Sequence, residues 1–102
     1  MRCQRTVTCK VSLHARPAAV VAERSRNLQP PVFLVKDGRR VLAASLTGIL
    51  SIEGLAGTQV TVESEGPGAG EAVEIIARLI ELGPDQPPTA GPETYEPEGD
   101  GQ

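Results

Sequence analysis

The sequence predicts an α+β fold, a two-layer sandwich in which helices cover one face of a four-stranded sheet. Two kinds of periodicity support this prediction. Segments in which apolar and polar residues alternate indicate strands, and segments with apolar residues three and four positions apart indicate helices. Glycine- and proline-rich turns separate these segments, and the resulting order along the chain is β-α-β-β-α-β-α.

The first strand is expected at residues 5–11, where Val7, Cys9 and Val11 alternate with polar residues. Cys3 and Cys9 would then lie about 20 Å apart, too far for a disulfide that leaves the strand intact. We expect both to be small, buried or half-buried residues. Because the chain has one histidine and no second cysteine pair, we expect no metal site.

The first helix is expected over residues 15–27. Pro17 fits only in a first turn, where the N–H that it lacks would have no partner within the helix. Asn27 is expected to end the helix in a left-handed conformation, and the pair of prolines that follows prevents continuation. The buried stripe of this helix is expected to consist of Ala18, Val21, Ala22 and Ser25.

The middle of the chain predicts a hairpin with strands at residues 32–36 and 39–43. Asp37 and Gly38 join them, and this pair is typical of type I′ turns, which need positive φ at both central positions. The two arginines that open the second strand are expected on a solvated edge that discourages the addition of further strands.

A short helix and a strand follow the hairpin. Ser45 is expected to be the N-cap of the helix at residues 46–52. In the strand after it, Val60 and Val62 are expected to face the core and Glu63 to face outward, because the apolar residues recur with period two.

The last helix is expected over residues 71–82, and Gly83 followed by proline ends it. Residues 84–102 are proline, glycine, acidic and polar residues almost throughout, so we expect a disordered tail there and a folded domain at residues 1–83. The buried stripe of the helix is expected to consist of Ala72, Ile75, Ile76, Leu79 and Ile80.

Charge and composition narrow the class of partner. The chain has 13 acidic and 10 basic residues, and five of the acidic residues lie in the tail, which leaves the body only mildly basic. Phe33 and Tyr95 are the only aromatic residues, so the sequence argues against a nucleic-acid partner. No apolar run approaches the roughly 18 to 20 residues of a membrane span, and the N-terminus lacks a signal-peptide segment, so we expect a cytoplasmic protein.

The tetrapeptide at residues 14–17 contains the residues that are expected to react. His14 is the only histidine, and Arg16 follows it where the helical pattern begins. A helix start offers unpaired N–H groups and a positive dipole end, and both attract anions. Imidazole titrates near neutral pH, and an arginine fork can hold two phosphate oxygens. We therefore expect His14 to accept a phosphoryl group and Arg16 to stabilise it.

The stretches VSLHARPAAVV and ASLTGILSIEGLAGTQVTV resemble the HPr family, the histidine-containing phosphocarriers of the bacterial phosphoenolpyruvate-dependent sugar phosphotransferase system. The resemblance covers about residues 4–83. It implies an open-faced β-sandwich, with an antiparallel sheet covered on one face by three helices. It also implies a carrier that needs no cofactor, is not a turnover enzyme, and is expected to be a monomer.

The resemblance assigns roles to single residues. His14 matches the histidine that enzyme I phosphorylates on Nδ1, with phosphoenolpyruvate as the donor, and that passes the group to EIIA domains for sugar uptake. Arg16 matches the arginine that neutralises the phosphate. Ser45 matches the serine that HPr kinase/phosphorylase modifies in many members. The chain departs from the usual pattern at Ser12, where members have glycine, and at Ala44, where a basic residue is frequent.

The short helix at residues 46–52 has too many apolar groups for one buried face, so some are expected on the surface near His14. Methionines are frequent at two of these positions in the family. The residues expected in this docking patch are Leu13, Ala19, Leu46, Thr47 and Leu50.

Two alternatives remain open at this stage. One is a phosphorelay regulator of a nitrogen- or potassium-linked branch, which would use the same chemistry. The other is a non-catalytic, ferredoxin-like binding module with a similar element order, against which stand the short second helix, the additional third helix and the scarcity of aromatic residues.

Overall fold

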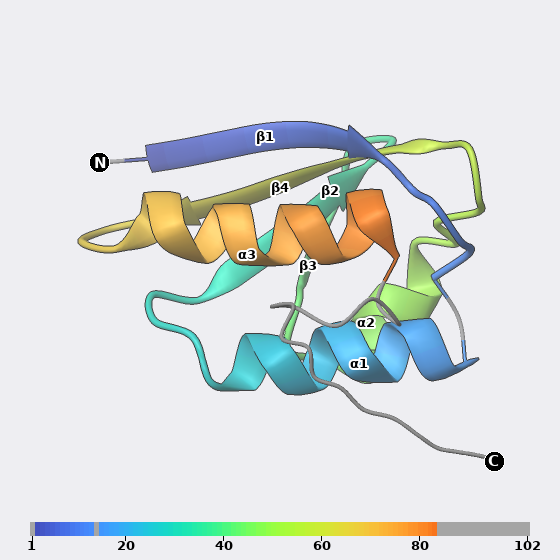
Figure 1. Ribbon diagram of the computed structural model, residues 1–102, viewed down its shortest axis with the longest axis horizontal. Coiled ribbons are helices and arrows are strands. Elements are labelled where there is room, and N and C mark those ends of the chain that lie inside the picture. The colour runs from blue at the N-terminus through green and yellow to red at the C-terminus, as the bar shows by residue number, and fades with distance from the viewer. Residues whose placement is uncertain (1, 14, 84–102) are drawn as a thin grey trace, which may run out of the picture.

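A computed structural model of the chain describes residues 2–13 and 15–83. It shows one antiparallel sheet of four strands with three helices on one of its faces (Figure 1). This arrangement confirms the predicted α+β open-faced sandwich. The elements in chain order are β1 (Arg2–Thr8), α1 (Ala15–Arg26), β2 (Val32–Lys36), β3 (Arg39–Leu42), α2 (Leu46–Ser51), β4 (Gln59–Glu65) and α3 (Ala69–Leu82). The tail predicted at residues 84–102 lies outside the described residues.

The strand order in the sheet is β1-β4-β2-β3, so the last strand in sequence lies at the centre. β4 pairs with β1 along its whole length, from Arg2 opposite Glu65 to Thr8 opposite Gln59. Its other edge pairs with β2, which forms the hairpin with β3. β4 therefore connects the two halves of the sheet.

The core lies between the sheet and the helices. Val60 and Val62 of β4 are buried, as predicted, and so are four residues of the stripe on α1. α3 begins two residues earlier than expected and buries most of its predicted stripe, with Ile75 only partly covered. The largest fully buried side chains include Leu13, Leu34, Ile49, Ile76 and Ile80.

The first strand lies three residues earlier than predicted. The alternating pattern continues back to Cys3, and the chain leaves the sheet at Cys9. Lys10 then donates its backbone N–H to the carbonyl of Ile80 at 3.0 Å, which ties this loop to the last turns of α3. The prediction that Val11 is on the buried face was wrong, because Val11 lies beyond the strand and is exposed. Both cysteines are free thiols.

Two turn predictions had different outcomes. Asp37 and Gly38 have φ values of 52° and 81°, which confirms the positive φ required by the type I′ turn. The prediction of a left-handed Asn27 was wrong, since Asn27 has no positive φ. Its backbone N–H donates to the carbonyl of Arg24 at 3.2 Å, so the helix ends in a tight right-handed turn.

Candidate functional site

The predicted phosphoryl site is located where the chain passes from the sheet into α1. His14 itself lies outside the described residues, but the residues on both sides of it are described. α1 begins at Ala15, directly after the histidine, and Pro17 occupies its first turn as predicted. The first turn of α1 has no acidic residue. An anion at this helix start would therefore meet the positive end of the dipole with no carboxylate from that turn to repel it.

Ala15 is in the left-handed region, with φ of 54°. For an L-residue other than glycine this conformation costs about 1–2 kcal/mol. Such strain persists only where the surroundings fix the backbone, and it is frequent next to functional groups. The sequence contains no signal for it, because alanine is an ordinary residue of right-handed helices. Ser12, at the position where glycine is usual in the family, has no positive φ.

The residue before His14 is fixed by the core. Leu13 is 2% exposed, and its backbone N–H donates to the carbonyl of Gly54 at 2.7 Å. A Cβ at position 54 would lie 3.1 Å from Cδ1 of Leu13, so glycine allows the two segments to approach closely. The prediction that Leu13 belongs to a docking patch was wrong, because its side chain is in the core.

The remaining candidates for docking are on the surface of two neighbouring helices. Arg16 and Ala19 are exposed on α1, and α2 packs against this helix (Figure 1). On α2, Leu46 and Leu50 are 37% and 40% exposed, and Thr47 is also exposed. Ile49 of α2 is fully buried, so this short helix contributes one large side chain to the core and leaves the other two, Leu46 and Leu50, on the surface.

Ser45 is the N-cap of α2, as predicted. Its hydroxyl oxygen accepts the backbone N–H of Gly48 at 3.1 Å and lies 3.3 Å from the hydroxyl oxygen of Thr47. A serine in this position satisfies one of the unpaired N–H groups of a helix start. The regulatory role of Ser45 stays a prediction.

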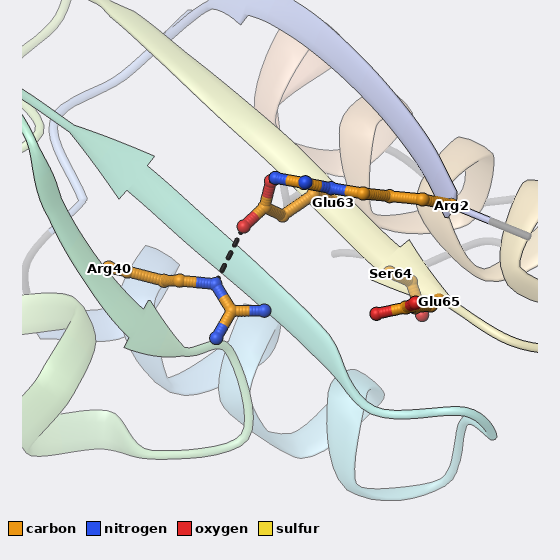
Figure 2. A pocket seen from close by; sticks show the side chains of 5 residues that line it. All are labelled: Arg2, Arg40, Glu63, Ser64 and Glu65. Atoms are coloured by element: carbon orange, nitrogen blue, oxygen red, sulfur yellow. Dashed lines mark hydrogen bonds and ion pairs between the residues drawn. The ribbon is translucent and has the colours of Figure 1, made fainter.

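A second polar cluster lies on the face of the sheet that no helix covers. Glu63 accepts hydrogen bonds from Arg2 and Gln4 of β1 at 2.9 Å each and from Arg40 of β3 at 2.6 Å. Figure 2 shows Arg40 reaching Glu63 from one side of β4, while Arg2 extends over Glu63 from the other side. These residues line a hollow of about 230 Å³ together with Ser64 and Glu65.

This cluster corrects two expectations. Glu63 faces away from the core, as predicted, but its side chain is only 4% exposed because the side chains of its partners cover it. Arg40 is not a simple solvated edge residue: it bonds Glu63, and its guanidinium lies 3.8 Å from the ring centroid of Phe33. The three hydrogen bonds, led by that of Arg40, lower the pKa of Glu63 from 4.5 to about 2.

Neither a metal-binding cluster nor a membrane-spanning helix is present among the described residues. In residues 2–13 and 15–83, no three His, Cys, Asp or Glu side chains gather so that they could hold a metal ion. No helix of this part of the chain is long and apolar enough to cross a membrane.

Comparison with known proteins assigns the family. The model of the family described as "PTS HPr component phosphorylation site" matches residues 1–81. The HPr-like protein Crh of Bacillus subtilis is 37% identical over 75 residues, which are 74% of this chain and 88% of Crh. The phosphocarrier protein NPr of Escherichia coli is 32% identical over 81 residues, 78% of this chain and 90% of NPr.

Solved structures agree with the sequence matches. The crystal structure of the phosphocarrier protein HPr from Bacillus anthracis superposes with a TM-score of 0.74 at 34% identity, covering 78% of this chain and 96% of that protein. These matches set aside the ferredoxin-like alternative. The chain therefore belongs to the HPr family of the phosphotransferase system, whose members are phosphocarriers and not turnover enzymes.

Proposed function

We propose that the chain accepts a phosphoryl group on His14 from enzyme I, with phosphoenolpyruvate as the original donor, and passes it to EIIA domains for sugar uptake. The observation that carries this proposal is the start of α1 at Ala15, directly after the only histidine, in a first turn without acidic residues. The family match over residues 1–81 includes this segment.

The chemistry is an exchange of one phosphorus–nitrogen bond for another. The neutral imidazole nitrogen of His14 attacks the phosphorus in line with the departing histidine of the donor, and the phosphoryl group transfers as that bond breaks. The backbone N–H groups of Ala15 and Arg16 and the guanidinium of Arg16 would stabilise the phosphoryl oxygens. This stabilisation has to be partial, because the group leaves again in the next transfer.

Partners are proposed to dock on the exposed side of α2 and the adjacent turn of α1. Leu46, Thr47 and Leu50 are exposed there, and Ala19 is exposed on α1. A small patch of this kind suits transient complexes, in which two proteins exchange a group and separate. Leu13 is excluded from this patch by its burial.

Ser45 is proposed as a target of an ATP-dependent HPr kinase. Its hydroxyl lies beside the proposed docking residues and already accepts the N–H of Gly48, so a phosphate there would add negative charge at the edge of the patch. Incubation with ATP and HPr kinase is expected to add the mass of one phosphate, and Ser45→Ala is expected to prevent it. A chain that gains no mass, or a Ser45→Ala variant that still does, refutes this proposal.

The branch of the phosphotransferase system is a separate matter. The relative NPr of Escherichia coli is matched as broadly as the HPr proteins, so a regulatory branch is the second candidate. Transfer of labelled phosphate from the chain to purified EIIA domains of each branch distinguishes the two, since the true acceptor takes the group faster.

The central test is labelling with radioactive phosphoenolpyruvate and enzyme I. The wild-type chain is expected to acquire one phosphate that is labile in acid and stable in base, as a phosphohistidine is. His14→Ala is expected to acquire none, and its unfolding temperature serves as the control for folding. Equal labelling of both chains, or no labelling of the wild type by several enzymes I, contradicts the proposal.

A further inference from the structure

The loop that leads to His14 is joined to a second loop, between α2 and β4, by four hydrogen bonds. Three of them join backbone groups and are available to any sequence with this fold. The fourth uses a side chain, the hydroxyl of Ser12. The four are Cys9 N–H to Thr58 O at 2.8 Å, Gly57 N–H to Cys9 O at 2.9 Å, Leu13 N–H to Gly54 O at 2.7 Å and Ala56 N–H to Ser12 Oγ at 3.0 Å.

Ser12 lies between the two points at which backbone bonds attach this loop to the second loop, and Lys10 in the same stretch is bonded to Ile80 of α3 instead. The chain is bonded to the second loop at Cys9 and again at Leu13, and of the described residues between these two, Ser12 alone bonds the second loop. Ser12 is half-buried, whereas Ala56 is exposed, so without the hydroxyl the N–H of Ala56 would turn to water.

The backbone on the far side of His14 needs such support. Ala15 is held at φ of 54°, a conformation that an unrestrained alanine leaves for the right-handed or extended regions. Leu13, on the near side, is fixed both by its burial and by its bond to Gly54. The attachment of the preceding loop to the second loop is therefore one of the contacts that fix this backbone, beside the packing of α1 through Ala18 and Val21.

We propose that Ser12 is a positioning residue for phosphoryl transfer. Its hydroxyl ties the loop of residues 9–13 to Ala56 and thereby keeps the segment around His14 in the geometry that transfer requires. The proposal rests on the proposed function of His14.

Loss of this bond should change the rate of transfer and leave docking unchanged. A loop with more freedom spends less time in the geometry for in-line attack, and the rate falls with the fraction of competent molecules. The exposed residues of α2 do not contact Ser12 through any hydrogen bond, so the KM for enzyme I should stay within about 2-fold.

The experiment compares Ser12→Ala and Ser12→Thr with the wild type. In Ser12→Ala the rate of phosphoryl transfer from enzyme I is expected to fall about 3- to 10-fold, the effect of one net hydrogen bond. Ser12→Thr retains a hydroxyl and is expected to restore the rate to within about 2-fold of the wild type. Amide hydrogen exchange at Ala56 is expected to accelerate in Ser12→Ala and not in Ser12→Thr.

Thr6→Val is the matched control, because it removes a hydroxyl that bonds Thr61 at 2.8 Å on the uncovered face of the sheet. An equal fall in the rate of phosphoryl transfer in Ser12→Ala and Thr6→Val would show a general loss of stability and overturn the proposal. So would an unchanged rate in Ser12→Ala with faster exchange at Ala56, or a raised KM with an unchanged rate. Failure of the wild type to take up phosphate would instead refute the proposed function, and the exchange measurement would still report the bond.

Discussion

The loop before His14 and the Glu63 cluster on the uncovered face of the sheet are held by different forces. The loop is fixed by backbone hydrogen bonds, one hydroxyl and the burial of Leu13, with no ion pair among these contacts. The cluster is fixed by charge: one carboxylate accepts hydrogen bonds from two arginines and a glutamine.

This difference suits the proposed chemistry. A site that binds and releases an anion gains from rigid neutral contacts, because a fixed carboxylate would repel the phosphate. On the uncovered face, away from the helices, charged contacts can join strands without affecting the transfer. Each of the following predictions changes one side of this comparison.

The largest effect is expected at the phosphoryl site. Arg16→Ala should slow transfer to and from the chain by about 100-fold, because one donor to the transition-state oxygens is lost. The free energy of unfolding should change by no more than about 0.5 kcal/mol, as is usual for an exposed residue. Rapid-quench kinetics measure the first quantity and thermal unfolding the second. Arg16→Lys is the control, and its rate of phosphoryl transfer should fall less than that of Arg16→Ala. A marked fall in the unfolding temperature would show that Arg16 is structural.

A smaller effect is expected at Glu63, on stability and not on transfer. Its pKa in the folded chain is about 2, below the ordinary 4.5, so its contribution is complete above pH 4.5 and is lost as the pH falls from 4.5 towards 2. The two arginines that bond Glu63 are more than half exposed. Solvent screening therefore reduces the contribution of Glu63 to the free energy of unfolding to about 1–2 kcal/mol.

Glu63→Gln should therefore lower stability at pH 7 and flatten its decline between pH 4.5 and 2, as measured by denaturant unfolding at each pH. Its rate of phosphoryl transfer should equal that of the wild type. A variant that transfers slowly while remaining folded would show that the two regions are coupled, against the comparison made above.

The smallest effect is expected at Ala15. Ala15→Gly removes the strain of a left-handed alanine, although glycine also loses more conformational freedom on folding. The balance should stabilise the chain by about 0.5–1 kcal/mol. Thermal unfolding measures it, with Ala19→Gly in the same helix as a control that should be destabilising. A destabilised Ala15→Gly would mean that the helix start is not strained in solution.

Local patterns predicted the elements whose determinants are close in sequence. The Asp37-Gly38 turn, the Ser45 cap and the stripe on α1 each depend on residues within a few positions of one another, and the structure confirms all three. The first strand was displaced because its start is set by pairing with β4, more than 50 residues away. The pattern of residues 5–11 alone does not contain that partner.

The place of the site in the fold was predictable from the sequence, whereas the contacts that support it were not. A lone histidine before an arginine and a proline identifies the helix start, and α1 begins at the expected residue. The burial of Leu13 depends on Gly54, and the cover of Glu63 depends on arginines 61 and 23 positions away in sequence. Contacts of this range follow from the topology and leave no local signal.

The bond between Lys10 and Ile80 has a practical consequence for anyone who labels this protein. Because it holds the end of α3 against the loop that precedes His14, a fluorophore attached next to Gly83 would lie beside Lys10 of that loop. A handle before Arg2 would start at the opposite end of β1, about 20 Å away along the strand. Assays that immobilise the chain should use that end.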